Sequence, residues 1–73
     1  MTDFNSPAPI PLTIRQRQVV ALAAAGHPNT TIARTLQIGV NTVKRHLKLA
    51  MQRLGARNRA HAVAQAFRAG ELT

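Results

Sequence analysis

The chain has 73 residues and no cysteine, and its ten Lys and Arg residues face only two acidic ones, which gives a formal net charge of +8 at pH 7. This length allows one domain at most, and the absence of cysteine excludes disulfide bonds and thiolate metal sites. The excess of positive charge predicts a negatively charged partner, with nucleic acid ahead of an anionic membrane surface.

Residues 1–11 contain three of the four prolines and no Lys or Arg, so we expect a flexible or extended N-terminal tail there. A single domain is expected at residues 12–70, followed by a short tail at 71–73. No apolar run is long enough for a signal peptide or a membrane span. We therefore expect a soluble, cytoplasmic and nucleoid-associated protein that has no membrane partner.

The first predicted helix begins after Thr13, because Thr13 and Gln16 have the spacing of a capping box. Leu12, just before the cap, can pack back onto the helix as a hydrophobic staple. Gly26 is expected in the left-handed conformation that ends a helix, and Pro28 prevents its continuation. The apolar positions between these signals have helical spacing: Val19, Leu22 and Ala23.

A short second helix is predicted from Asn29, which is a good N-cap residue. Gln37-Ile38-Gly39 then forms a tight connection in which Ile38 points inward and Gly39 supplies backbone freedom. The apolar face of this helix is formed by Ile32, Ala33 and Leu36.

A third helix is predicted from about Val40 to Leu54 and is closed by Gly55. At about 100° per residue, its apolar residues fall within one stripe, formed by Val43, Leu47, Ala50 and Leu54. The opposite side carries Asn41, Lys44, Arg45, Lys48 and Gln52. Solvated helix faces normally mix both signs of charge, yet no acidic residue lies between Phe4 and Gly70. This basic face is therefore predicted to lie against a negatively charged partner.

A fourth helix is predicted from Asn58 to about Ala69, with Gly70 as its stop. One apolar stripe on it consists of Ala60, Val63, Ala64 and Phe67. A second stripe of small residues consists of Ala62, Ala66 and Ala69. We expect this second stripe to be exposed and to form a homodimer interface, with Arg59 and Val63 at its edge. No strand signal occurs anywhere, so the fold is predicted to be all-α.

Two helices joined by about three residues, the second with its cations opposite its apolar stripe, are typical of a DNA-binding helix-turn-helix. The string I-x-x-x-T-V-K-x-H, from Ile38 to His46, is followed by L-G at residues 54–55. With these motifs the chain resembles the LuxR-type (GerE-like) helix-turn-helix domains of bacterial transcription regulators, over about residues 12–70. Further matching residues are Leu12-Thr13, Arg15, Arg17, Val19, Gly26, Asn29, Ile32-Ala33, Leu36, Arg59 and Ala62-Val63.

The resemblance implies a four-helix domain whose third helix enters the major groove and whose fourth helix makes a dimer on an inverted repeat. The base-reading positions would then be Lys44, Arg45 and Lys48, with Asn41 close by. Contacts to DNA phosphates are expected from Thr31, Thr42, Arg17, Arg34 and Arg57. The chain departs from the usual family residues at Gln16, Thr31, Gly39, Ala50, Ala56 and His61. Because Ala50 replaces a bulky aliphatic residue, we expect Phe67 to fill the space left in the core.

Two other functions remain open. One is a promoter-recognition module resembling region four of sigma factors; the other is an adaptor that keeps the fold and binds RNA polymerase or another regulator. A cationic membrane-active peptide is disfavoured, because the chain has few aromatic residues and several internal helix caps. No catalytic triad or carboxylate pair is present, and the three His residues have no metal-binding spacing, so we expect no enzyme activity, cofactor, metal or small-molecule ligand.

Overall fold

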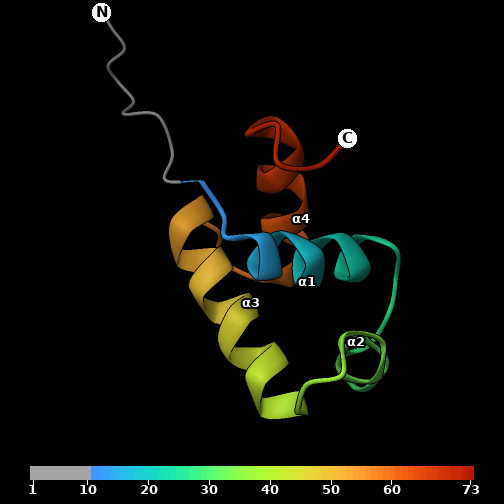
Figure 1. The fold of residues 1–73 in the computed structure, drawn as a ribbon. Coiled ribbons are helices and arrows are strands. Elements are labelled where there is room, and N and C mark those ends of the chain that lie inside the picture. The colour runs from blue at the N-terminus through green and yellow to red at the C-terminus, as the bar shows by residue number, and fades with distance from the viewer. Residues whose placement is uncertain (1–10) are drawn as a thin grey trace, which may run out of the picture.

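The computed structural model describes residues 11–73, so the tail predicted at the N-terminus lies outside the described residues except for Pro11. The described part contains four α-helices and no strand, which confirms the all-α prediction (Figure 1). α2 and the start of α3 lie together on one side of α1, and α4 lies on the other side. The helix bounds are α1 Ile14–Ala24, α2 Asn29–Leu36, α3 Val40–Leu54 and α4 Arg59–Arg68.

The predicted capping box at the start of α1 is present. The amide of Gln16 donates to Thr13 Oγ1 at 3.1 Å, and the amide of Thr13 donates to Gln16 Oε1 at 3.0 Å. Gln16 is only 4% exposed. An uncharged amide at this position therefore completes the box without burying a charge, which would cost more free energy than burying a hydrogen-bonded neutral group.

The turn between α2 and α3 differs from the prediction in one backbone detail. Gln37, not Gly39, adopts the left-handed conformation, with φ 58° and ψ 45°, whereas Gly39 is extended with φ −72°. This geometry lets the amide of Ile38 donate to the carbonyl of Ala33 at 3.0 Å, which closes the C-terminus of α2. A non-glycine residue in this conformation costs roughly 1–2 kcal/mol, so the turn is held by its surroundings.

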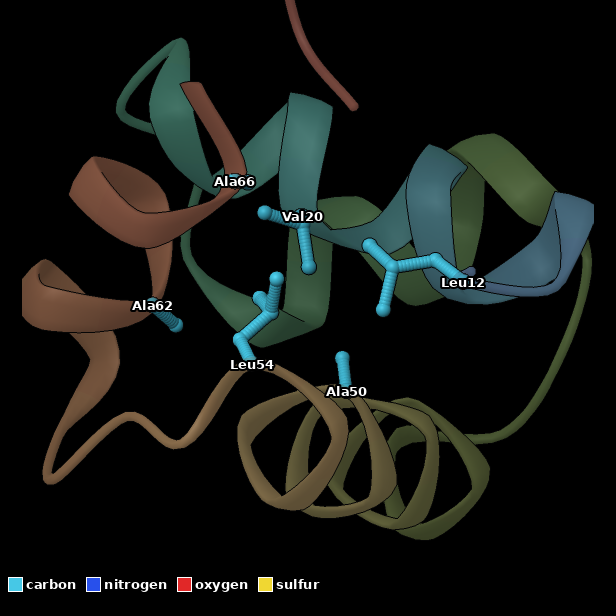
Figure 2. Close-up of a cluster of buried hydrophobic side chains, with 6 residues drawn as sticks. All are labelled: Leu12, Val20, Ala50, Leu54, Ala62 and Ala66. Atoms are coloured by element: carbon cyan, nitrogen blue, oxygen red, sulfur yellow. The ribbon is translucent and has the colours of Figure 1, made fainter. Parts of the chain in front are cut away.

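The core consists of two clusters that α1 joins. Adjacent residues of α1 point into different clusters, Val19 toward α2 and α3 and Val20 toward α3 and α4, and half-buried Leu47 packs against both clusters. The first cluster contains Leu12, Val20, Ala50, Leu54, Ala62 and Ala66 (Figure 2). The second contains Val19, Ile32, Ala33 and Val43.

The prediction for the two faces of α4 was wrong. Ala62 and Ala66 are completely buried, whereas Phe67 is 49% exposed and does not fill the core beside Ala50. Leu12 and Leu54 lie with Ala50 in the same cluster instead. In so small a core the helix backbones approach closely, and alanine is the side chain that permits this approach. The larger residues of α4 are therefore left on its outer face.

The segment predicted as a tail at 71–73 is tied to the start of α1. The amide of Leu12 donates to Glu71 Oε2 at 2.8 Å, and Arg17 Nη2 lies 3.0 Å from Glu71 Oε1. Leu72 packs against the first cluster. The hydrogen bond from the Leu12 amide, followed by the hydrogen bond and charge of Arg17, outweighs desolvation and holds the pKa of Glu71 below its usual value.

Neutralising Glu71 should therefore weaken the domain. Because the folded-state pKa lies below the usual 4.5, the stabilisation is complete above about pH 4.5 and is lost as the pH falls through the folded-state pKa. Glu71→Gln should lower the free energy of unfolding at pH 7 by about 1 kcal/mol, since one charge-assisted hydrogen bond is weakened and the Arg17 side chain is partly exposed. Urea unfolding of both proteins between about pH 3 and pH 7 checks this. Parallel pH profiles for the two proteins would contradict the assignment.

Candidate nucleic-acid interface

The α3 helix is buried in the core on one side and exposed to solvent on the other. Val43, Ala50 and Leu54 are buried, while the outward side chains are all exposed: Asn41, Lys44, Arg45, Lys48 and Gln52. Within residues 11–73, no hydrogen bond or ion pair engages the side chains of Lys44, Arg45 or Lys48. The structure thus leaves three positive charges free on the face opposite the anchor.

This face matches the dimensions of a DNA groove. The rise of about 1.5 Å per residue places Lys44 and Lys48 about 6 Å apart along the helix axis, with Arg45 between them. An α-helix fits the major groove of B-DNA, which is about 12 Å wide. Asn41 lies one turn before Arg45 and extends the same face toward the N-terminus of α3. The predicted base-reading residues are therefore together on one exposed surface.

The first turn of α2 lies next to this surface. Its N-cap is Pro28 rather than the predicted Asn29, and no side chain caps the helix. Asn29 and Thr30 of this turn line a pocket together with Lys44 and Arg59. A helix N-terminus with free amides, beside a lysine, favours an anion such as a phosphate. Of the two predicted threonine contacts, Thr31 is half-buried and Thr42 is exposed.

Arg59 forms hydrogen bonds within the domain and is not free at the edge of a dimer interface. Its guanidinium donates to the side-chain oxygen of Asn29 and, at 2.7 Å, to the backbone carbonyl of His27. These bonds join the start of α4 to the loop before α2. Arg59 therefore positions the first turn of α2, a role that sequence reasoning missed because the partners are about thirty positions apart in the chain.

The other predicted phosphate contacts differ in availability. Arg34 and Arg57 are exposed, and their guanidinium groups make no hydrogen bond among the described residues. Arg17 also lies at the surface, but its Nε and Nη2 both point to Glu71 Oε1, at 3.1 and 3.0 Å. Arg34 and Arg57 are therefore free for an external anion, whereas Arg17 would have to share its guanidinium with Glu71.

The predicted dimer residues are not brought to one surface. Ala62 and Ala66 are in the core, and a completely buried side chain has no area to offer a second copy. Val63 is half-buried and Ala69 is exposed. The exposed stripe of α4 is instead formed by Ala60, Ala64 and Phe67.

His46, at the edge of the α3 face, is half-buried. Among the described residues, no three His, Cys, Asp or Glu side chains lie close enough to hold a metal ion. No helix between residues 11 and 73 has the length and apolar character needed to cross a membrane.

Comparison with known proteins agrees with this geometry. Residues 10–66 match the family described as "Bacterial regulatory proteins, luxR family". The chain is 43% identical over 61 residues to the HTH-type transcriptional activator RamA of Corynebacterium glutamicum, a match that covers 84% of this chain and 22% of RamA. It is also 43% identical over 65 residues to the transcriptional activator protein BjaR1 of Bradyrhizobium diazoefficiens, with 85% and 27% covered.

The fold has a counterpart among solved structures as well. The structure of the transcription factor GerE superposes with a TM-score of 0.81 and 32% identity, and the match covers 85% of this chain and 92% of GerE. The chain spans about a quarter of the length of RamA and BjaR1, so the match to them is confined to one domain. The chain belongs to the luxR family of bacterial regulatory proteins and has the four-helix helix-turn-helix fold of GerE.

Proposed function

We propose that this domain binds double-stranded DNA sequence-specifically and acts as a small bacterial transcriptional regulator, or as the DNA-binding part of a larger one. The observation that carries the proposal is the set of three free cations, Lys44, Arg45 and Lys48, on the α3 face opposite the buried anchor. In this arrangement α3 enters the major groove, and the site of action is the cytoplasm, at the nucleoid. The match to the luxR family and to transcriptional activators supports this function over a sigma-like promoter module.

The side chains divide into base readers and phosphate contacts. Arg45 is the favoured reader of guanine, because its planar guanidinium can donate to O6 and N7 together. Lys44, Lys48 and Asn41 contact neighbouring bases. The free amides at the start of α2, with Thr31, Thr42, Arg34 and Arg57, hold the phosphates on either side. Phosphate contacts fix the register of the helix, and base contacts provide the specificity.

Selection from a random pool of duplex oligonucleotides tests the proposal directly. The purified protein should enrich a short motif, and the logarithm of its dissociation constant should rise linearly with the logarithm of the salt concentration. Retention of all duplexes alike, or of none, would contradict specific binding. Binding to RNA polymerase or another regulator without any enrichment of DNA would identify the domain as an adaptor instead.

We further propose that two copies bind an inverted repeat through the outer face of α4. Ala60, Ala64 and Phe67 are exposed at positions i, i+4 and i+7, so they form one apolar stripe with half-buried Val63 beside it. Two-fold symmetry pairs such a stripe with itself and places two basic α3 helices on one duplex, with half-sites about one helical turn apart. A second copy of this chain would cover the apolar stripe on α4.

Ala64→Asp should abolish the dimer on DNA, because it places two carboxylates together at the symmetric contact. On a duplex that carries both half-sites, sedimentation should show the natural protein binding cooperatively as two copies, whereas the variant should fill the two half-sites independently. Ala64→Ser, which is small and neutral, serves as the matched control and should retain cooperative binding. A single copy of the natural protein on the full duplex would refute dimerisation.

A further inference from the structure

Leu49 is an exposed apolar side chain within an otherwise polar surface. Three large apolar side chains of the described residues are notably exposed: Ile14 at 73%, Phe67 at 49% and Leu49 at 36%. Leu49 is the one of these that belongs to α3. It lies one turn after Arg45 and, at about 100° per residue, only about 40° from it around the helix. Leu49 is thus part of the proposed groove-facing surface.

The core does not explain Leu49. The α3 residues that pack into the two clusters are Val43, Leu47, Ala50, Met51 and Leu54, together with Val40 at the helix start. Leu49 is about 120° from Val43 and 140° from Leu54 around the helix, given the same 100° step. Leu49 is 36% exposed, so part of its apolar side chain is available to a partner that lies against this face of α3.

The charges around Leu49 define that surface. Arg45 lies four positions before it, Lys48 is its neighbour and Arg53 lies four positions after it. Glu71, the one acidic side chain among residues 11–73, is occupied by Leu12 and Arg17. A partner that covers Leu49 must offer an apolar group among negative charges. The major groove offers this combination, because the thymine C5 methyl lies on its floor between two phosphate backbones.

We propose that Leu49 contacts the C5 methyl group of a thymine and is a specificity-determining residue of the domain. This inference rests on the proposed DNA binding and adds an apolar contact to it. Four residues of helix rise by about 6 Å, close to two base-pair steps of about 3.4 Å. The thymine therefore lies within about two base pairs of the guanine read by Arg45.

Replacement of thymine by deoxyuridine tests the contact, because it removes only the methyl group and leaves base pairing unchanged. In the selected operator, one such replacement in a single half-site should weaken binding of the natural protein about fourfold, the value expected for one buried methyl group. Leu49→Ala should bind both operators alike. Ile14→Ala, which removes an exposed apolar side chain of α1 rather than of α3, should keep the full fourfold difference. Circular dichroism of each variant verifies its fold.

The outcomes separate this inference from the proposed function. If Leu49→Ala and the natural protein lose the same affinity at every thymine position, or if no position responds, the contact is refuted while specific binding stands. An operator without thymine near the guanine has the same consequence. If no operator is enriched at all, the proposed DNA binding itself fails.

Discussion

Ala62→Asp should unfold the domain, whereas Ala64→Asp, two positions further along the same helix, should leave it folded. Ala62 is completely buried among Leu12, Val20 and Leu54 in the first cluster, and Ala64 is exposed. A carboxylate at position 62 would have neither space nor a hydrogen-bond partner. The cost of burying it is several kcal/mol, which approaches the total of about 4–11 kcal/mol expected for a domain of this size.

Thermal and urea unfolding, followed by circular dichroism, measure both effects. Ala62→Asp should show little helical signal at room temperature, and Ala64→Asp should melt within a few degrees of the natural protein. Equal destabilisation by the two substitutions would mean that α4 does not present Ala62 to the core. Ala62→Leu provides a graded version of the same test, because overpacking a filled core costs about 1–3 kcal/mol.

Arg45→Ala should weaken binding to the selected operator by about 5-fold to 150-fold, which corresponds to about 1–3 kcal/mol for one bidentate base contact. Binding to random duplex DNA should change far less, because that binding depends on phosphate contacts. Titration of both duplexes at one fixed salt concentration measures the ratio of the dissociation constants for random and operator DNA. The preference for guanine at the contacted position should relax at the same time.

Arg34→Ala is the matched control for this experiment. Arg34 is exposed on α2 and is proposed to contact phosphate, so its loss should weaken operator and random DNA by the same factor and reduce the salt slope by about 1. If Arg45→Ala behaves in the same way as Arg34→Ala, then Arg45 is a phosphate contact and the assignment of the reading face is wrong.

The parts of the fold that the sequence predicted are those governed by local rules. The bounds of α3 agree with the prediction at both ends, because fifteen residues keep one apolar period and Gly55 supplies the left-handed stop. The capping box at Thr13 depends on two residues only three positions apart, so the sequence predicted it as well. The exposed cations of α3 followed from the same periodicity.

The features that sequence reasoning missed depend on contacts between distant segments. Two stripes of α4 were equally helical in spacing, and only the close approach of α1 and α3 decides that the small one, with Ala62 and Ala66, faces inward. The hydrogen bond between Arg59 and Asn29 joins residues 30 positions apart, and the one between Leu12 and Glu71 joins residues 59 positions apart. No local sequence pattern predicts such pairs. A single acidic residue in so basic a chain could, however, have suggested that Glu71 has a partner within the domain.

The hydrogen bond between Leu12 and Glu71 also has a consequence for how the domain can be attached to other polypeptide. It brings the entry and exit points of the chain together beside the C-terminal half of α3, where Leu12 packs against Ala50 and Leu54. α2 and the start of α3 lie at the opposite end of the molecule (Figure 1). The chain therefore leaves the folded core at Leu12 and at Glu71 from one place, which lies away from the turn between α2 and α3 that is proposed to meet the DNA.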